Sequence, residues 1–198
     1  MKFTQSFSAS LLLTVSLFTN AQNIDDQVNQ LVANMTLDEK VGQMTQVERK
    51  ELDHISDLAT YNIGSLLSGG GSAPIPNTLD AWIKMYNEYQ TASMQSSSEI
   101  PLIYGIDAVH GHSNVVGAVI VPHNIGLGAT WNAELVEDLS KVVANEVAAT
   151  GIDWTFAPCI AVPQNEKWGR TYEGFGETAE INQMMGIASV VGLQGNDL

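Results

Sequence analysis

The chain has 198 residues, with 8 Lys and Arg against 22 Asp and Glu, and its formal net charge at pH 7 is -14. Hydrophobic residues make up 44% of the chain and charged residues 15%, a composition that supplies a packed core and excludes an intrinsically disordered protein. The acidic balance also excludes a general nucleic-acid-binding protein, because contacts with phosphates need clustered Lys and Arg side chains.

Residues 1–21 are predicted to be a cleavable signal peptide. After a positively charged start, the apolar run from Leu11 to Phe18 is too short to span a bilayer, and the small residue Ala21 ends the segment. A buried N-terminal helix is the weaker alternative, because the polar stretch from Asn20 to Asp26 follows the run directly. No cysteine lies near the predicted cleavage after Ala21, so we expect residues 22–198 to be secreted or periplasmic, without a membrane anchor.

Hydrophobic periodicity predicts helices that alternate with strands along the mature chain. The predicted helices run from Ile24 to Met35, from Leu37 after a Thr36–Glu39 capping box, from Asn77 to about Ser93, from Asn132 to Gly151, and from Thr178. The predicted strands cover residues 63–67, 101–106 and 152–156, while the apolar run 115–121 is left without a type. This alternation indicates an α/β fold with a parallel sheet. A closed barrel takes about 250 residues, so we expect the incomplete front part of a (β/α)8 TIM-like barrel.

The same periodicity predicts which side chains face the core. The helix after Asn132 is expected to bury Leu135, Leu139, Val142, Val143 and Val147, and the helix after Thr178 to bury Ile181, Met184, Met185, Ala188 and Val191. The single Cys159 lies in an apolar run and is predicted to be a buried, inert thiol. A catalytic thiol is the weaker alternative, because no neighbour in the sequence would lower its pKa.

Asp107 follows the apolar run 101–106 directly and is the first candidate site residue. Function in parallel α/β folds gathers where strands end, so its carboxylate is expected to lie at the mouth of the barrel. A carboxylate in this position suits hydrogen bonding to paired sugar hydroxyls. The alternative is a structural carboxylate that caps nearby amides.

His110 and His112 flank one glycine after the same predicted strand and suggest a metal site. Two such imidazoles can chelate zinc, with Asp107 or His123 completing the ligand set. Metal-dependent barrel hydrolases of that kind place the pair after their first strand, whereas here it follows a later one. We therefore favour structural histidines that bond to backbone carbonyls, and we predict no metal and no cofactor.

The segment from Trp168 to Glu173 is the densest polar and aromatic cluster, and Arg170 is its candidate site residue. The guanidinium fork can hold hydroxyls or a carboxylate while the aromatic rings line a sugar. The alternative is a salt bridge with Glu166, Glu173 or Glu177. The triple glycine of residues 69–71 lacks any phosphate-binding pattern and is predicted to be a flexible turn.

Four segments, in this order, resemble the N-terminal barrel domain of glycoside hydrolase family 3, the β-glucosidase and exo-glucanase family. They are Met35–Met44, Ile100–His112 (IPLIYGIDAVHGH), Pro122–Asn132 (PHNIGLGATWN) and Phe156–Gly176 (FAPCIAVPQNEKWGRTYEGFG), followed by Gly192–Gly195. The resemblance covers essentially the whole mature chain, and the ordered set is far more specific than any one segment.

The resemblance implies substrate-binding roles for two residues. Asp107 corresponds to the family aspartate that binds the non-reducing sugar in subsite −1, and Arg170 corresponds to the arginine that helps to hold the same sugar. The run Gln164–Lys167 stands where the family often has an Arg-Asp-Pro-Arg-like run, a difference that alters loop contacts but leaves Trp168-Gly169-Arg170 intact.

For the intact enzyme, the resemblance implies retaining hydrolysis through a covalent glycosyl intermediate, which requires two carboxylates about 5–5.5 Å apart. The family's Lys-His sugar-binding pair, its nucleophilic aspartate and its acid/base glutamate are all expected beyond Leu198. We therefore expect no catalytic residue in this chain and no catalysis by it alone.

Three hypotheses follow for the function. The first is a fragment of a secreted retaining β-glycosidase that releases non-reducing terminal sugars from β-glucosides or β-glucans. The second is a short, non-catalytic protein that binds sugar or a partner, which is disfavoured because an incomplete barrel leaves open sheet edges. The third, a metal-dependent barrel hydrolase that uses His110 and His112, is the weakest.

Overall fold

The computed structural model describes residues 23–195, so the predicted signal peptide lies outside the described residues. The chain divides into two compact units, and the first ends at Met35. Its described part is helix α1 (Ile24–Asn34), whose start is capped by the Asn23 side chain. The predicted helix is confirmed and ends one residue early. Its apolar side chains are exposed: Ile24, Val28, Leu31 and Val32.

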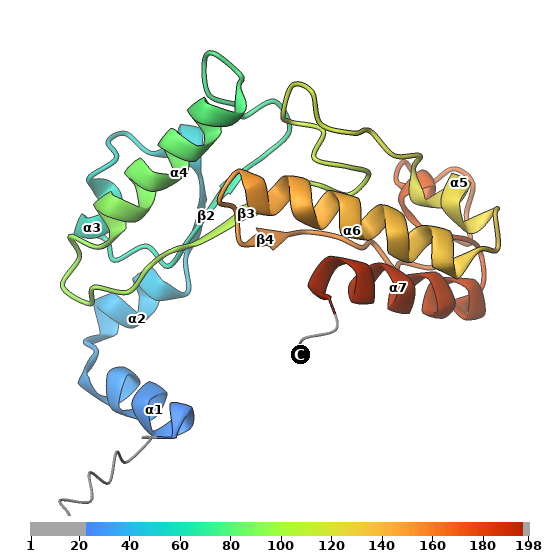
Figure 1. Ribbon diagram of the computed structural model, residues 1–198. Coiled ribbons are helices and arrows are strands. Elements are labelled where there is room, and N and C mark those ends of the chain that lie inside the picture. The colour runs from blue at the N-terminus through green and yellow to red at the C-terminus, as the bar shows by residue number, and fades with distance from the viewer. Residues whose placement is uncertain (1–22, 196–198) are drawn as a thin grey trace, which may run out of the picture. The chain divides into compact units, whose positions relative to one another are not determined.

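The second unit, from Thr36 onward, is built on a parallel sheet of four strands. The strands are β1 (Gln46–Glu48), β2 (Ser65–Ser68), β3 (Ile103–Ile106) and β4 (Trp154–Thr155), and they pair in chain order (Figure 1). In the register, Val47 pairs with Leu66, and Leu66 pairs with Tyr104. The predicted parallel α/β sheet is confirmed. Strand β1 was not predicted, because three residues with two polar side chains carry no periodic signal.

Helices and short helical turns precede, connect and follow these strands. They are α2 (Leu37–Gln43), the short 3-10 helix η1 (Arg49–Glu51), α3 (Asp57–Thr60), α4 (Leu79–Ser93), α5 (Asn124–Gly128), α6 (Ala133–Ala149), the 3-10 helix η2 (Thr171–Glu173) and α7 (Ala179–Gln194). The capping box at α2 is confirmed, because Thr36 and Glu39 each accept a hydrogen bond from the backbone N–H of the other. Helix α4 begins two residues after Asn77, because Thr78 is its cap. The run 115–121 forms turns and irregular backbone.

Two clusters of buried side chains hold the unit together. One lies between the sheet and the helices and includes Leu66, Tyr104, Ile106, Leu58, Trp82, Val143 and Val147. The other joins α5, α6 and α7 and includes Leu127, Val136, Phe175, Ile181 and Met185. Figure 1 shows α6 and α7 side by side, in agreement with the dense packing between these two helices.

The predicted core face of α6 was only partly right. Val143 and Val147 are buried as expected, but Leu135 and Val142 are 39% and 38% exposed. The buried face is instead rotated toward Val136 and Ser140, because α7 packs there. In α7, Met185 is fully buried and Met184 packs beside it, which confirms both methionines as core residues.

Candidate functional site

Asp107 follows the last residue of β3, at the carboxyl end of the parallel sheet, and its side chain is exposed. The backbone around it is tied to the next strand, because Phe156 N–H donates to the Ile106 carbonyl at 3.0 Å and Ala108 N–H donates to Thr155 Oγ1 at 3.3 Å. Within residues 23–195, no hydrogen bond or ion pair engages the Asp107 carboxylate. This part of the chain thus holds no amide that the carboxylate caps, and its oxygens are available to a ligand.

Arg170 lies at the start of η2 and is held by Glu173. Its Nε donates to the two Glu173 carboxylate oxygens at 3.0 and 2.9 Å, and its Nη2 donates to Oε2 at 2.6 Å. Of the three glutamates considered as partners, the structure selects this one. The Arg170 side chain is 65% exposed and that of Glu173 only 13%. The hydrogen bonds from Arg170 to Glu173 raise the pKa of Arg170, so the fork remains charged and faces outward.

Three aromatic rings connect the loop after β3 with the η2 segment. The ring centroids of His110 and His123 are 4.1 Å apart, and His123 meets Tyr172 edge to face at 4.6 Å. His110 Nδ1 lies 3.3 Å from the Val121 carbonyl oxygen, to which it donates, as predicted for a structural histidine. The loop that carries Asp107 and the segment that carries Arg170 are therefore linked through His123.

The side chain of Asn124 holds the η2 segment through hydrogen bonds. It is 3% exposed, and its Nδ2 donates to the Glu173 carbonyl at 2.7 Å and to the Cys159 carbonyl at 3.4 Å. Asn124 and His123 are adjacent, so the start of α5 contacts the η2 segment twice. Neither role was predicted, because the run Pro122–Asn124 lies outside any periodic pattern and only the tertiary structure brings it to Glu173.

His112 points away from His110 into the protein interior. Its ring is fully buried, lies 5.7 Å from the Trp82 ring, and contacts the Thr150 hydroxyl through Nε2. The expected carbonyl partner for His112 was wrong, since a hydroxyl takes its place. Among residues 23–195, no group of three or more His, Cys, Asp or Glu side chains is arranged to hold a metal ion.

Two further predictions concern loops at this end of the sheet. Cys159 is half-buried rather than buried, because it lies in the irregular segment after β4. The triple glycine forms the predicted turn: Ser72 N–H donates to the Gly69 carbonyl, and Gly71 has a φ of +74°, which favours glycine. The Gly71 N–H donates to the Asn114 side chain at 3.2 Å, which joins this turn to the loop after β3.

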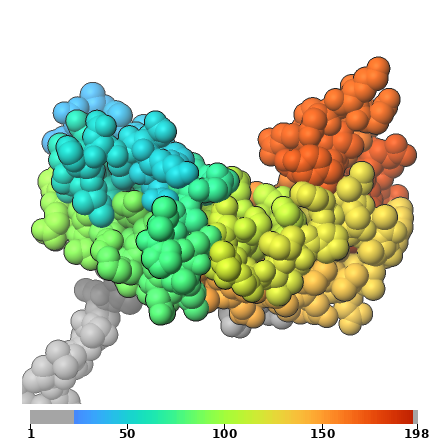
Figure 2. Space-filling view, turned by 90° about the horizontal axis from the view of Figure 1, so that it is seen from above, coloured from blue at the N-terminus to red at the C-terminus, as the bar shows by residue number. Residues whose placement is uncertain are grey.

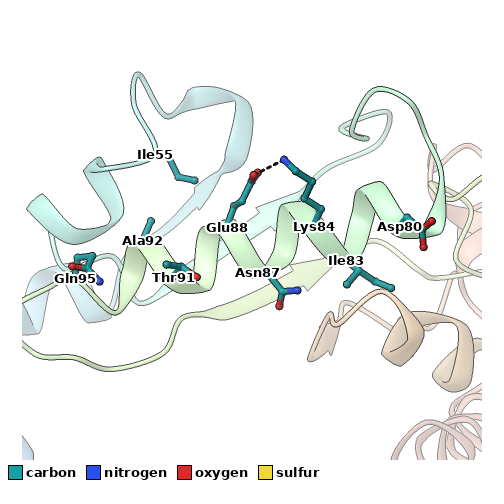
Figure 3. A pocket seen from close by; sticks show the side chains of 9 residues that line it. All are labelled: Ile55, Asp80, Ile83, Lys84, Asn87, Glu88, Thr91, Ala92 and Gln95. Atoms are coloured by element: carbon teal, nitrogen blue, oxygen red, sulfur yellow. Dashed lines mark hydrogen bonds and ion pairs between the residues drawn. The ribbon is translucent and has the colours of Figure 1, made fainter.

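Two hollows in the described surface are not lined by Asp107 or Arg170. A hollow of about 950 Å³ follows the outer face of α4, where Figure 3 shows the Lys84–Glu88 ion pair above Ile83 and Asn87. An apolar groove of about 720 Å³ runs beside α7 and includes Ile160, Ile187 and Val190. Neither hollow contains a predicted site residue. Figure 2 shows the orange segment that follows β4 standing out from the surface.

Within the described residues, no helix combines the length and apolar character needed to cross a bilayer.

Residues 36–198 match the Glycosyl hydrolase family 3 N terminal domain. The chain is 37% identical to the lysosomal beta glucosidase of Dictyostelium discoideum, covering 87% of this chain and 23% of that protein. It is 31% identical to the periplasmic beta-glucosidase of Salmonella typhimurium, covering 86% of this chain and 21% of that protein. The chain therefore spans less than a quarter of the length of these curated relatives.

Solved structures agree with the sequence comparison. The exo-1,3/1,4-beta-glucanase of a Pseudoalteromonas species superposes with a TM-score of 0.80 at 40% identity, over 87% of this chain and 22% of that one. A mutant beta-glucosidase of Listeria innocua in complex with laminaribiose superposes with a TM-score of 0.67 at 28% identity, over 86% of this chain and 24% of that one. The four parallel strands are thus part of a TIM-barrel-like α/β fold, and the chain belongs to glycoside hydrolase family 3, whose N-terminal domain it matches.

Proposed function

We propose that the chain supplies part of the subsite that holds the non-reducing terminal sugar in a secreted, retaining β-glycosidase of the β-glucosidase type. The substrate class is a β-linked glucoside or glucan. The observation that carries the proposal is the pair of ligand-ready groups at the carboxyl end of the sheet: the unengaged carboxylate of Asp107 and the outward-facing guanidinium of Arg170.

The chemistry of these two groups suits a sugar ring. The Asp107 carboxylate offers two acceptor oxygens, which match two neighbouring equatorial hydroxyl donors at one edge of a glucopyranose. The Arg170 fork offers donors to a hydroxyl or ring oxygen, and Glu173 restricts its rotation through Nε and Nη2. A guanidinium that is already oriented loses less conformational entropy when a sugar binds.

We propose that the chain alone binds sugar without cleaving it. Retaining hydrolysis needs a nucleophile and an acid/base group about 5–5.5 Å apart across the scissile bond. In the described site, Glu173 accepts three hydrogen bonds from Arg170, and Asp107 is assigned to sugar binding. We do not assign either of these carboxylates as the nucleophile.

Export is the second part of the proposal. The Salmonella typhimurium relative is a periplasmic beta-glucosidase, and this similarity supports a secreted or periplasmic location. Cleavage after Ala21 is the part of the proposal that rests on the sequence pattern alone. N-terminal sequencing of protein recovered from the periplasm or medium would test it. A recovered chain that begins at Gln22 supports export, and a chain that retains residue 1 and stays in the cytoplasm contradicts it.

Titration of the chain with glucose and laminaribiose, followed by NMR chemical shifts, tests the binding proposal. Asp107→Asn removes the charge with little change in shape, and Asp80→Asn on the outer face of α4 is the matched control. We expect saturable shifts in the original chain and in the control, and about tenfold weaker binding in Asp107→Asn, as for the loss of a charge-assisted hydrogen bond. Equal shifts in all three chains, or no saturable shifts in the original chain, would overturn the assignment of the sugar site.

A further inference from the structure

Among the described residues, His123 is the only one whose ring contacts both a ring of the loop after β3 and a ring of the η2 segment. On one side its ring stacks on His110, with centroids 4.1 Å apart and planes tilted by 36°. On the other side it meets Tyr172 at 4.6 Å with planes at 73°. Tyr172 belongs to η2 and lies between Arg170 and Glu173 in the sequence, so the ring contact is made within the same short segment as the ion pair.

Hydrogen bonds hold the His110 ring and the backbone next to Tyr172 against residues that lie close to His123 in the chain. His110 exchanges contacts with Val121, since Val121 N–H donates to the His110 carbonyl at 3.0 Å and His110 Nδ1 donates to the Val121 carbonyl at 3.3 Å. The carbonyl of Glu173 is held at 2.7 Å by the buried amide of Asn124, the residue next to His123. The ring of His123 therefore bridges two anchored segments.

We propose that His123 is a positioning residue that couples the Asp107 loop to the Arg170–Glu173 ion pair through its neutral ring, and that protonation of this ring loosens the pair. The proposal deepens the proposed function and rests on it where the bound sugar is concerned. The coupling of His123 to the ion pair does not depend on a bound sugar and rests on the contacts of its ring with His110 and Tyr172.

The groups that face His123 explain the effect of a proton. From the loop after β3 comes His110, and from the η2 segment come Tyr172, Glu173 and, beyond them, Arg170. His123 is exposed, and its slight desolvation together with the adjacent His110 lowers its pKa, while the Glu173 carboxylate opposes this shift. An imidazolium at position 123 would attract Glu173 and repel the Arg170 guanidinium. Because Arg170 is much more exposed than Glu173, it is the group that would move into solvent.

The Arg170 Nε–H is a direct reporter of the coupling. It donates to both carboxylate oxygens of Glu173, so we expect its proton to exchange with water more slowly while the pair is intact than after the pair opens. We would measure this exchange by NMR in the ¹⁵N-labelled full chain, with the resonance assigned through Arg170→Lys. His123→Ala removes both ring contacts and is expected to speed exchange about tenfold, because the favourable interaction of each aromatic pair is lost. His123→Phe keeps an aromatic ring and is expected to stay within about twofold of the original chain.

A pH series separates positioning from a merely structural role. In the original chain, protection of the Arg170 Nε–H should fall as pH is lowered below about 6.5, the ordinary pKa of histidine. In His123→Phe, protection should persist to the lower pH at which carboxylates titrate. His54→Phe, at an exposed histidine before α3, is the matched control and should behave as the original chain. The comparison of the original chain with His123→Phe tests the positioning role even if His123→Ala fails to fold.

Unchanged exchange in a folded His123→Ala, or the same pH profile in His123→Phe as in the original chain, would overturn the proposal. A glucose titration distinguishes a failure of the His123 proposal from a failure of the proposed sugar site. If the original chain binds glucose, His123→Ala should bind it about tenfold more weakly, and equal binding would count against the positioning role. If the original chain binds no glucose, the sugar-binding proposal fails, and the exchange measurement still decides whether His123 couples the two segments.

Discussion

The Nε2 atom of His112 lies 3.1 Å from Oγ1 of Thr150, whose hydroxyl in turn donates to the Val147 carbonyl at 2.6 Å. The single hydroxyl hydrogen of Thr150 is used for that carbonyl, so the proton between the two side chains belongs to His112 Nε2. Nδ1 is then an acceptor, and within the described residues it has no hydrogen-bond partner although it is buried. The fold therefore holds a neutral imidazole in a defined tautomer between Trp82 and the end of α6.

This relationship predicts acid destabilisation. Burial lowers the pKa of His112 to about 4, against 6.5 in the unfolded chain, so the unfolded state binds a proton more readily. The contribution to stability is fully present above pH 6.5 and is lost as pH falls through 4. Its size is roughly 3 kcal/mol, because one pKa unit corresponds to about 1.4 kcal/mol. Urea unfolding of the original chain and of His112→Gln between pH 7 and pH 4 would measure it. A constant difference between the two across this range would contradict the prediction.

Gly192 of α7 predicts a second effect on stability. A methyl group at this position would collide with the Glu137 backbone oxygen in α6, where the two helices meet. We expect Gly192→Ala to lower the free energy of unfolding by about 1–3 kcal/mol, although alanine favours helices. Gly186→Ala in the same helix is the control, because its methyl group would meet the exposed side chain of Ile160, which can move. Chemical unfolding should place the control within about 1 kcal/mol of the original chain, and equal losses would refute this packing argument.

Asp107→Ala separates function from stability. Its carboxylate is exposed and makes no hydrogen bond in the described part of the chain, so the free energy of unfolding should change by no more than about 0.5 kcal/mol. In an enzyme that carries this segment, the same change should severely reduce turnover of β-glucosides. Calorimetry and a glycoside assay check the two halves. Near-normal activity would remove Asp107 from the site, and a large loss of stability would assign it a structural role.

Arg170→Lys tests whether the planar fork matters. Lysine keeps the charge but cannot donate two hydrogen bonds in one plane to the Glu173 carboxylate and still present a donor outward. We expect sugar binding to weaken about tenfold, while stability changes by less than about 1 kcal/mol, as is usual for an exposed ion pair. Titration calorimetry with glucose, beside urea unfolding, measures both. Unchanged sugar affinity would mean that Arg170 serves only the ion pair.

The sequence alone determined the class of the fold and the residues that begin its helices. Alternating helical and apolar segments predicted a parallel α/β sheet, and local capping chemistry placed the start of α2 at Leu37 and of α6 after Asn132. These features depend on contacts within about one helical turn along the chain, and such contacts are visible in sequence. The resemblance carried by the segments around Asp107 and Arg170 likewise identified the family before any geometry was known.

The tertiary structure determined the contacts between segments that are far apart in the sequence. It turned the buried face of α6 from Leu135 toward Val136, because α7 packs there. It chose Glu173 among three glutamates for Arg170, and it separated His110, stacked on His123, from the buried His112. Each of these choices depends on side chains that are far apart in the sequence or on the direction in which a loop turns. Hydrophobic periodicity reports neither, so only the packed structure could reveal them.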